Sequence, residues 1–157
     1  RKIFNIKDEN IINGIKNISL KGRLEEIKSG KLKDIAGNNK LVIDGGHNIS
    51  ASFSIANWIK NQNEEANLIV GMMKDKEHVE FIKAFENIVN SITLIDIPNQ
   101  DGAISKEDFK KKLDNSKLNL KLSNNIKESI KSLSKNENTI ILCVGSLYLA
   151  GEILSLN

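Results

Sequence analysis

Residues 41–48 read Leu-Val-Ile-Asp-Gly-Gly-His-Asn, and this stretch determines the fold that we predict. Three apolar residues run directly into an acid, two glycines, an imidazole and an amide. Such a pattern is typical of a buried strand that ends in a tight polar loop. In open α/β sheets, ligands bind beyond the carboxyl ends of parallel strands. If residues 41–43 form such a strand, Asp44, His47 and Asn48 lie where a ligand would bind.

Downstream of this stretch, apolar strand-like runs alternate with segments of helical periodicity. After 41–44 we expect strands at 66–72, 92–97, 118–122 and 139–144. Helices are expected between and after them, one with Ser105 as its N-cap. Strands separated by helices of about ten residues indicate βαβ units and a largely parallel sheet. Because 66–72 and 139–144 lack polar alternation, we place them at the centre of a Rossmann-like sheet with both faces covered.

The segment before residue 41 is less regular. Residues 8–18 have helical spacing but are weakened by a glycine and three asparagines, and we expect a helix or linker there. We predict a boundary at 19–23, a strand at 24–27 and a polar connection at 30–39. Since the first residue is Arg1 and not Met, we expect the chain to be part of a longer protein.

Composition bounds the class of protein. The chain has 157 residues, 39% hydrophobic and 27% charged, which fits one soluble domain with a real core. No apolar run approaches the ~20 residues that span a bilayer, and no signal peptide is recognisable. The single cysteine, Cys143, fits a reducing cytoplasm. A net charge of +3, with lysines scattered among acids, excludes a nucleic-acid binder of the basic type. We therefore expect a cytoplasmic protein without membrane or nucleic-acid partners.

Common catalytic motifs are absent from the sequence. It holds no G-x-x-x-x-G-K-[ST] phosphate loop, no G-x-G-x-x-G dinucleotide fingerprint and no G-x-S-x-G nucleophile elbow. Two separated histidines and one cysteine cannot build a zinc site alone. A complete enzyme of a common class is thus not expected within these residues.

The loop at 44–48 is the first candidate site. Asp44 could accept hydrogen bonds from ribose hydroxyls, and His47 could orient an anion or a carboxylate. The alternative is that Asp44 caps the following helix and His47 is a surface residue. For an acid, two glycines, His and Asn together at a strand end, we favour the ligand site, because the glycines permit close approach.

Two further loops and one arginine are weaker candidates. The charges of 71–76, including Lys74, could meet a phosphate or a neighbouring domain, or be solvated. Ser146 in 145–148 could be an N-cap, or part of a helix N-terminus that binds an anion. Arg23 could stack on a flat ring or pair with phosphate, although most arginines are surface residues. His78, Trp58 and Cys143 are assigned to structure.

Four motifs in order resemble a known family. They are Gly22–Glu25, Ile43–Asn48, Gly71–Lys76 and Gly145–Glu152. Together they resemble the C-terminal domain of folylpolyglutamate synthase/dihydrofolate synthase, a branch of the Mur ligase superfamily, over roughly residues 20–155. The resemblance implies a three-layer α/β domain whose mostly parallel sheet has one antiparallel edge strand. Residues 1–19 would then be a linker or the tail of an N-terminal ATPase domain, and 20–157 the C-terminal domain.

The resemblance also implies an activity. Such ligases activate a folate or dihydropteroate carboxylate as an acyl phosphate with ATP and Mg²⁺, and the amino group of L-glutamate displaces phosphate. The N-terminal domain carries the phosphate loop, the Mg²⁺ ligands and most of the folate site. By motif position, Arg23 and Asp44 would bind ATP, and His47 and Ser146 would serve catalysis or glutamate binding. A monomer is expected, inactive as this piece alone.

The sequence departs from the family at three points, and two alternatives stay open. Lys21 and Ile49 stand where the family often has proline. The connection from Arg23 to Asp44 is long, which suggests a hairpin insertion at 29–39. A cell-wall Mur ligase would share the fold but usually lacks the Gly-Ser-Leu-Tyr segment. A non-catalytic nucleotide- or protein-binding module of flavodoxin-like shape is the alternative outside the enzymes.

Overall fold

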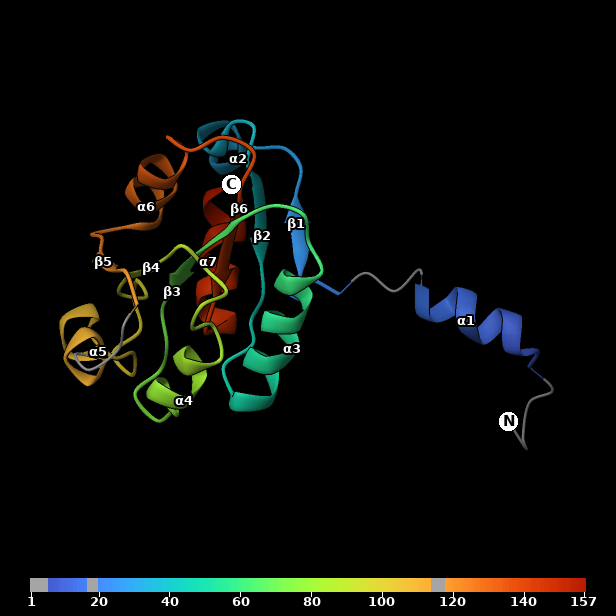
Figure 1. Cartoon of the computed structure of the whole chain (residues 1–157), viewed down its shortest axis with the longest axis horizontal. Coiled ribbons are helices and arrows are strands. Elements are labelled where there is room, and N and C mark those ends of the chain that lie inside the picture. The colour runs from blue at the N-terminus through green and yellow to red at the C-terminus, as the bar shows by residue number, and fades with distance from the viewer. Residues whose placement is uncertain (1–5, 17–19, 114–117) are drawn as a thin grey trace.

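The computed structural model describes residues 6–16, 20–113 and 118–157, and Figure 1 shows their arrangement. The helices are α1 (Asp8–Lys16), α2 (Lys31–Ala36), α3 (Ile49–Lys60), α4 (His78–Lys83), α5 (Lys106–Lys112), α6 (Ile126–Leu133) and α7 (Leu147–Leu156). The strands are β1 (Glu25–Ile27), β2 (Lys40–Ile43), β3 (Ala66–Val70), β4 (Ser91–Leu94), β5 (Leu120–Leu122) and β6 (Ile140–Val144). Each predicted strand is therefore present, within a few residues of its expected bounds.

The strands form one six-stranded sheet in the order β1-β2-β6-β3-β4-β5. All neighbours pair in parallel except β1, which lies antiparallel to β2 at one edge, with Glu25 opposite Ile43. Every residue of β3 and β6 is buried, as the lack of polar alternation predicted. The mostly parallel sheet with an antiparallel edge strand is confirmed.

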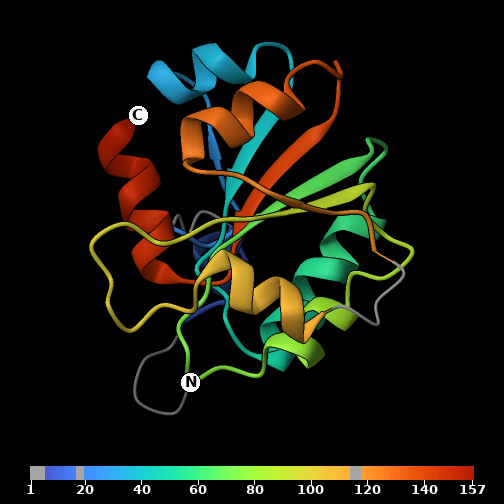
Figure 2. The ribbon, with the colours of Figure 1, turned by 90° about the vertical axis from the view of Figure 1, so that its left-hand side faces the viewer.

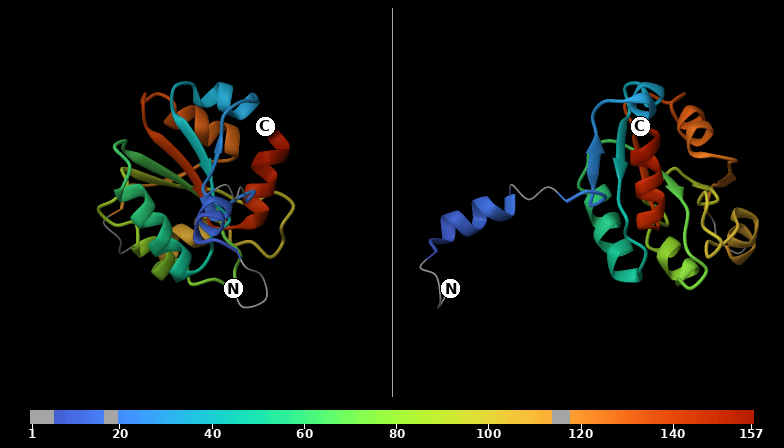
Figure 3. Two further views of the ribbon diagram at one scale, coloured as in Figure 1. Left: turned by 90° about the vertical axis from the view of Figure 1, so that its right-hand side faces the viewer. Right: turned by 180° about the vertical axis from the view of Figure 1, so that it is seen from behind.

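Helices cover both faces of the sheet, which gives three layers (Figures 2 and 3). One face packs against α3, α4 and α5 through an apolar cluster that includes Ile55, Phe81 and Phe109. The other face packs against α2, α6 and α7 through a second cluster that includes Ile130 and Ile153. The alternating side chains of each strand divide between these two clusters. In Figure 1, α1 lies apart from the three layers.

Several helices begin at a side chain that accepts a hydrogen bond from the first turn. Ser105 Oγ accepts from the backbone N–H of Asp108 at 3.1 Å, so the predicted N-cap of α5 is confirmed. Asn125 caps α6 in the same way, at 2.9 Å. In the described part of the chain, no helix has the length and apolarity needed to cross a membrane.

The connection at 30–39 differs from the prediction. Instead of a polar connection or a hairpin insertion, it contains α2, whose Leu32 and Ala36 are fully buried. The side chain of Asn157, at the far end of the chain, accepts hydrogen bonds from the backbone N–H groups of Leu32 and Lys33 at 3.1 and 3.3 Å. Because this cap is 125 residues away from Leu32, no local pattern announces the helix.

Two smaller predictions also changed. The helix expected between the strands at 66–72 and 92–97 is short, since α4 has six residues and ends at Lys83, and its Val79 is 42% exposed. The helix expected at 8–18 is described to Lys16, and part of the boundary expected at 19–23 lies outside the described residues.

Candidate functional site

A crevice forms at the carboxyl edge of the sheet, on both sides of β6. The chain leaves β6 toward α7, on the face that also carries α2 and α6. The chain leaves the neighbouring strands β2 and β3 toward α3 and α4, on the opposite face. Where neighbouring loops diverge in this way, an α/β sheet opens a site for ligands. The three loops predicted as candidate sites follow these three strands.

Asp44 organises the loop after β2. Its carboxylate is 7% exposed and accepts the backbone N–H of Gly46 at 2.6 Å and that of Leu24 at 2.9 Å. It does not cap α3, because Asn48 accepts the N–H of Ala51 at 2.8 Å and holds that position. The alternative that Asp44 caps the following helix was therefore wrong. The carboxylate instead holds the glycine loop and connects it to a second segment.

That second segment is the turn at 22–24, which carries Arg23. Gly45 N–H donates to the carbonyl of Gly22 at 2.8 Å, so the turn lies directly on the glycine loop. Leu24 has a φ of 43°, a conformation that costs energy for a branched residue and is held by the bond from its N–H to Asp44. The guanidinium of Arg23 is exposed and donates to Gly22 O at 3.2 Å.

Gly45 lies at a closely packed position of the loop. A Cβ at Gly45 would lie 2.2 Å from Leu147 Cδ2 and 2.9 Å from Arg23 Nη1. Both distances are shorter than side-chain carbons can approach other atoms, so the turn at 22–24 and the start of α7 close around a bare backbone. A side chain at position 45 would therefore require Leu147 and Arg23 to move.

Ser146 lies at the turn from β6 into α7. Its hydroxyl accepts the N–H of Tyr148 at 3.1 Å, so Ser146 is an N-cap, and the residue is 3% exposed. The preceding Gly145 has a φ of 107°, and its N–H donates to Gly46 O at 3.0 Å. A Cβ at Gly145 would lie 2.7 Å from the carbonyl oxygen of Gly71. The loops after β2, β6 and β3 are thus in direct contact.

Two depressions open among these loops, and His47 lines both. The smaller, about 260 Å³, is bounded by Arg23, Asp44 and the glycine loop. The larger, about 540 Å³, is bounded by Ser146, Tyr148 and the turn after β3. All four predicted site residues therefore line one or the other of two depressions that share His47.

The imidazole of His47 has a defined orientation. Its Nδ1 lies 2.9 Å from the carbonyl oxygen of Gly45. Because a carbonyl only accepts, Nδ1 carries the proton in this arrangement, and Nε2 of the neutral ring is left as an acceptor. His47 can thus take a proton or a hydrogen bond from a group bound in the crevice.

The charged side chains of the turn after β3 do not all face the same depression. Asp75 and Lys76 line the larger depression, with the Lys76 ammonium 2.8 Å from the Asp75 carboxylate. That hydrogen bond holds the pKa of Asp75 below its usual value. Lys74 points elsewhere: its Nζ donates to Asp101 O at 2.8 Å and borders a separate depression. Of the charges predicted at 71–76, only two therefore reach the crevice.

The described residues show neither a metal-binding cluster nor a reactive thiol. Among the described residues, no three His, Cys, Asp or Glu side chains gather closely enough to hold a metal ion. Cys143 is buried in β6, and this burial raises the pKa of its thiol to about 12. Its structural assignment from the sequence fits, since a buried protonated thiol is a poor nucleophile.

Sequence reasoning missed two features that build the site. The cap at Asn48 has a local signal, an amide three residues before the bonded N–H of Ala51, but the acid at 44 was the more obvious choice. The positive φ of Leu24 has no signal, because leucine is not a residue that favours it.

The fold and the loops at the carboxyl edge of the sheet define a Rossmann-like α/β domain with a candidate ligand site at that edge. The family model for the dihydrofolate synthetase C-terminal domain matches residues 28–156. The chain belongs to this family. The match favours the folate branch over the cell-wall ligases, and it confirms the resemblance based on the four motifs.

Individual relatives agree with this assignment. The chain is 24% identical to the probable dihydrofolate synthetase of Schizosaccharomyces pombe over 161 residues, covering 96% of this chain and 37% of that protein. The solved Mycobacterium tuberculosis folylpolyglutamate synthase complexed with ADP and AMPPCP aligns with a TM-score of 0.79 and 18% identity, over 97% of this chain and 35% of that one. This chain thus spans little more than a third of the length of either relative.

A second solved structure has the same fold. The bifunctional folylpolyglutamate synthase/dihydrofolate synthase of Yersinia pestis, complexed with AMPPNP and Mn ion, aligns with a TM-score of 0.77 and 16% identity. The alignment covers 97% of this chain and 35% of that one. At such identities the structural likeness establishes the fold, and the roles of single residues need their own tests.

Proposed function

We propose that this chain is the C-terminal part of an ATP-dependent ligase that adds L-glutamate to dihydropteroate, to folates, or to both. The observation that carries the proposal is that Arg23, Asp44, His47 and Ser146 line two depressions that share His47, in a chain of this family. Residues 20–157 would form the C-terminal domain, and 1–19 a linker or the tail of an N-terminal ATPase domain. The activity would require that second domain, so this chain alone should be inactive.

The smaller depression is proposed to hold part of ATP. Arg23 offers an exposed guanidinium at its rim, suited to stack on a flat ring or to bind phosphate oxygens in fork geometry. Asp44 has accepted one N–H on each oxygen and keeps further lone pairs for a ribose hydroxyl. The solved relatives are complexed with ADP, AMPPCP or AMPPNP, which supports a nucleotide here.

Mg²⁺ is proposed to bind with ligands from outside these residues. The Yersinia pestis relative is complexed with Mn ion. The residues described here offer no cluster of three metal-binding side chains, so their fit to a metal ion is poor. Any divalent ion would therefore be held by the N-terminal domain and the nucleotide phosphates.

The larger depression is proposed to receive L-glutamate. An attacking amine must lose a proton, and Nε2 of His47 is positioned as an acceptor for it. Because Ser146 Oγ accepts from Tyr148 N–H, its own hydrogen remains available to a carboxylate. Lys76, paired with Asp75, lines the same depression and offers further donor hydrogens. These residues would bind and orient the amino acid while the N-terminal domain activates the folate carboxylate.

The nucleotide assignment is tested best at Arg23. In the full-length ligase, Arg23→Ala should raise the KM for ATP about tenfold or more, because a charge-assisted contact to the nucleotide is lost. Lys21→Ala is the matched control, since it removes a charge from the same turn two residues away. Steady-state kinetics at varied ATP would reject the assignment if the two variants behaved alike.

The glutamate assignment is tested at His47. His47→Ala should lower kcat/KM for glutamate by about 10²-fold, the usual contribution of a positioned proton acceptor, and leave the KM for ATP near its original value. An unchanged kcat/KM for glutamate would contradict the role of His47 without affecting the test at Arg23.

A further inference from the structure

His78 is a buried titratable group that the proposed chemistry does not use. The residue is 2% exposed and begins α4, directly after the turn that lines the larger depression. Its ring packs edge-on against Phe109 of α5, with ring centroids 5.0 Å apart. The sequence suggested only a structural residue. Its two ring nitrogens, however, contact α5 and the turn after β3.

The hydrogen bonds of His78 fix its tautomer. Lys112 Nζ lies 3.2 Å from Nδ1, and Met73 O lies 3.0 Å from Nε2. An ammonium group only donates, so Nδ1 must accept, and a carbonyl only accepts, so Nε2 must carry the hydrogen. His78 is therefore neutral and protonated on Nε2 in this arrangement.

The carbonyl that His78 binds is the anchor of the turn after β3. Met73 O also accepts the backbone N–H of Lys76 at 3.4 Å, which closes the turn. That turn presents Asp75 and Lys76 to the larger depression, which His47 also lines. A relay thus runs from Lys112 on α5, through the imidazole, to the turn that forms one wall of the crevice.

We propose that His78 is a positioning residue, held by Lys112, that sets the turn at 73–76 for binding of the amino-acid substrate in the larger depression. The inference rests on the proposed function for its substrate, while the relay itself rests on geometry. His78 acts through the Met73 carbonyl and touches no reacting atom.

The relay works only with neutral His78, which gives it a pH dependence. Burial, and then the Lys112 ammonium, lower the pKa of His78, and the hydrogen bond to Met73 O and the nearby Asp75 and Glu77 carboxylates oppose this only in part. A lowered pKa keeps the ring neutral down to pH values at which an ordinary histidine is already protonated. Protonation at acid pH would turn Nδ1 into a donor facing an ammonium, and the contact to Lys112 would be lost. Substrate binding should therefore weaken as pH falls through the His78 pKa.

The kinetic test compares two substitutions in the full-length ligase. His78→Phe keeps a ring but removes both hydrogen bonds, and should raise the KM for glutamate about tenfold with little change in the KM for ATP. His78→Gln restores an N–H donor and an oxygen acceptor, and should recover most of the affinity while flattening the acid limb of the pH profile. Equal glutamate KM values for wild type and His78→Phe would overturn the positioning role.

A spectroscopic test on this chain separates the relay from the proposed function. The ¹⁵N shifts of His78 should report the Nε2–H tautomer at neutral pH, and Lys112→Met should raise the His78 pKa, because a facing positive charge is removed. Lys110→Met, at an exposed position of the same helix, should leave that pKa unchanged. An Nδ1–H tautomer, or equal His78 pKa values in the two lysine variants, would refute the relay even if the ligase activity is confirmed.

Discussion

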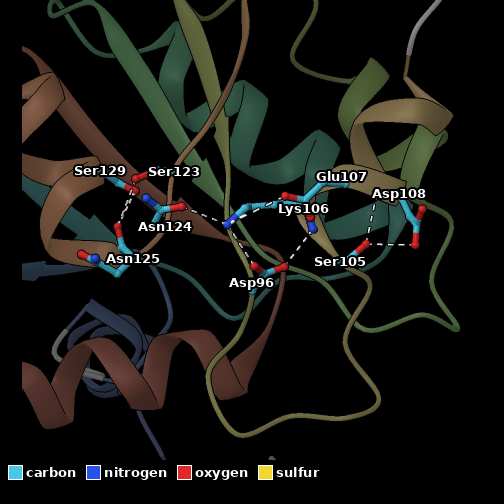
Figure 4. Close-up of polar contacts among 9 residues, drawn as sticks. All are labelled: Asp96, Ser105, Lys106, Glu107, Asp108, Ser123, Asn124, Asn125 and Ser129. Atoms are coloured by element: carbon cyan, nitrogen blue, oxygen red, sulfur yellow. Dashed lines mark hydrogen bonds and ion pairs between the residues drawn. The ribbon is translucent and has the colours of Figure 1, made fainter.

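The carboxyl edge of the sheet has two halves that use polar residues in opposite ways. Beyond β2, β6 and β3, the loops are held by backbone groups and by Asp44, and the side chains of Arg23 and His47 face the crevice. Beyond β4 and β5, polar side chains bind one another around Lys106 (Figure 4). We call these the open half and the closed half.

Lys106 is the hub of the closed half. Its backbone N–H donates to Asp96 Oδ1 at 2.9 Å, and its ammonium lies 3.2 Å from Asp96 Oδ2. The same ammonium donates to Asn124 at 3.3 Å, at the start of the segment leading to α6. With 14% of its side chain exposed, Lys106 joins the ends of both strands. The closed half thus uses its polar groups for structure.

The comparison shows why polar residues at strand ends do not identify a site by themselves. Both halves have acids, amides and a serine N-cap. They differ in what holds the loop: glycine backbone in the open half, side-chain pairs in the closed half. In the open half, backbone bonding leaves the side chains of Arg23 and His47 available to a ligand, whereas in the closed half Asp96 and Asn124 are already bound to Lys106.

The largest expected effect is a loss of stability when a methyl group is added to the glycine backbone of the open half. Gly145→Ala should lower the free energy of unfolding by about 3 kcal/mol, because a methyl group would meet the Gly71 carbonyl in a conformation that alanine rarely adopts. Gly151→Ala, in α7 with nothing within 4 Å of the added carbon, should be neutral or slightly stabilising. Urea unfolding measures both. Equal losses would mean that close packing of the loops is unimportant.

The next prediction concerns the stability lost when one acid of each half is replaced by its amide. Asp44→Asn should cost about 2 kcal/mol, since an amide nitrogen would face a backbone N–H that now donates to a buried carboxylate. Asp96→Asn should cost about 1 kcal/mol or less, because Asp96 is half exposed and its ion pair is screened. The two unfolding midpoints, measured under one condition, should differ in this order. The reverse order would remove the distinction between the halves.

Much of this edge could be predicted from the sequence because its signals are local. The apolar run before Asp44 indicated a buried strand, and the two uniformly apolar runs were correctly placed at the centre of the sheet. The candidate loops followed from strand ends, which chain order alone reveals. Asp44, His47 and Ser146 could therefore be proposed as site residues from strand ends, and Arg23 from its motif.

The features that escaped prediction depend on distant partners. Helix α2 relies on a cap from Asn157, and the conformation of Leu24 relies on Asp44, twenty residues away. The imidazole of His78 has a role only through Lys112 and the Met73 carbonyl. The separation of open and closed halves likewise depends on which side chains pair, and a sequence does not display pairing between loops.

The smallest expected effect tests the closed half. Lys106→Met keeps most of the apolar stem but removes the contacts to Asp96 and Asn124, and should cost about 1 kcal/mol of unfolding free energy. In the full-length ligase the KM values for ATP and glutamate should stay within about twofold, or a few tenths of a kcal/mol. The reason is that Lys106 belongs to the closed half and lines neither proposed substrate depression. Arg23→Ala should give the opposite pattern, with altered ATP kinetics and little loss of stability. If Lys106→Met changed substrate affinity as strongly as Arg23→Ala, the ligand site would extend across β4 and β5, and the closed half would have to open during turnover.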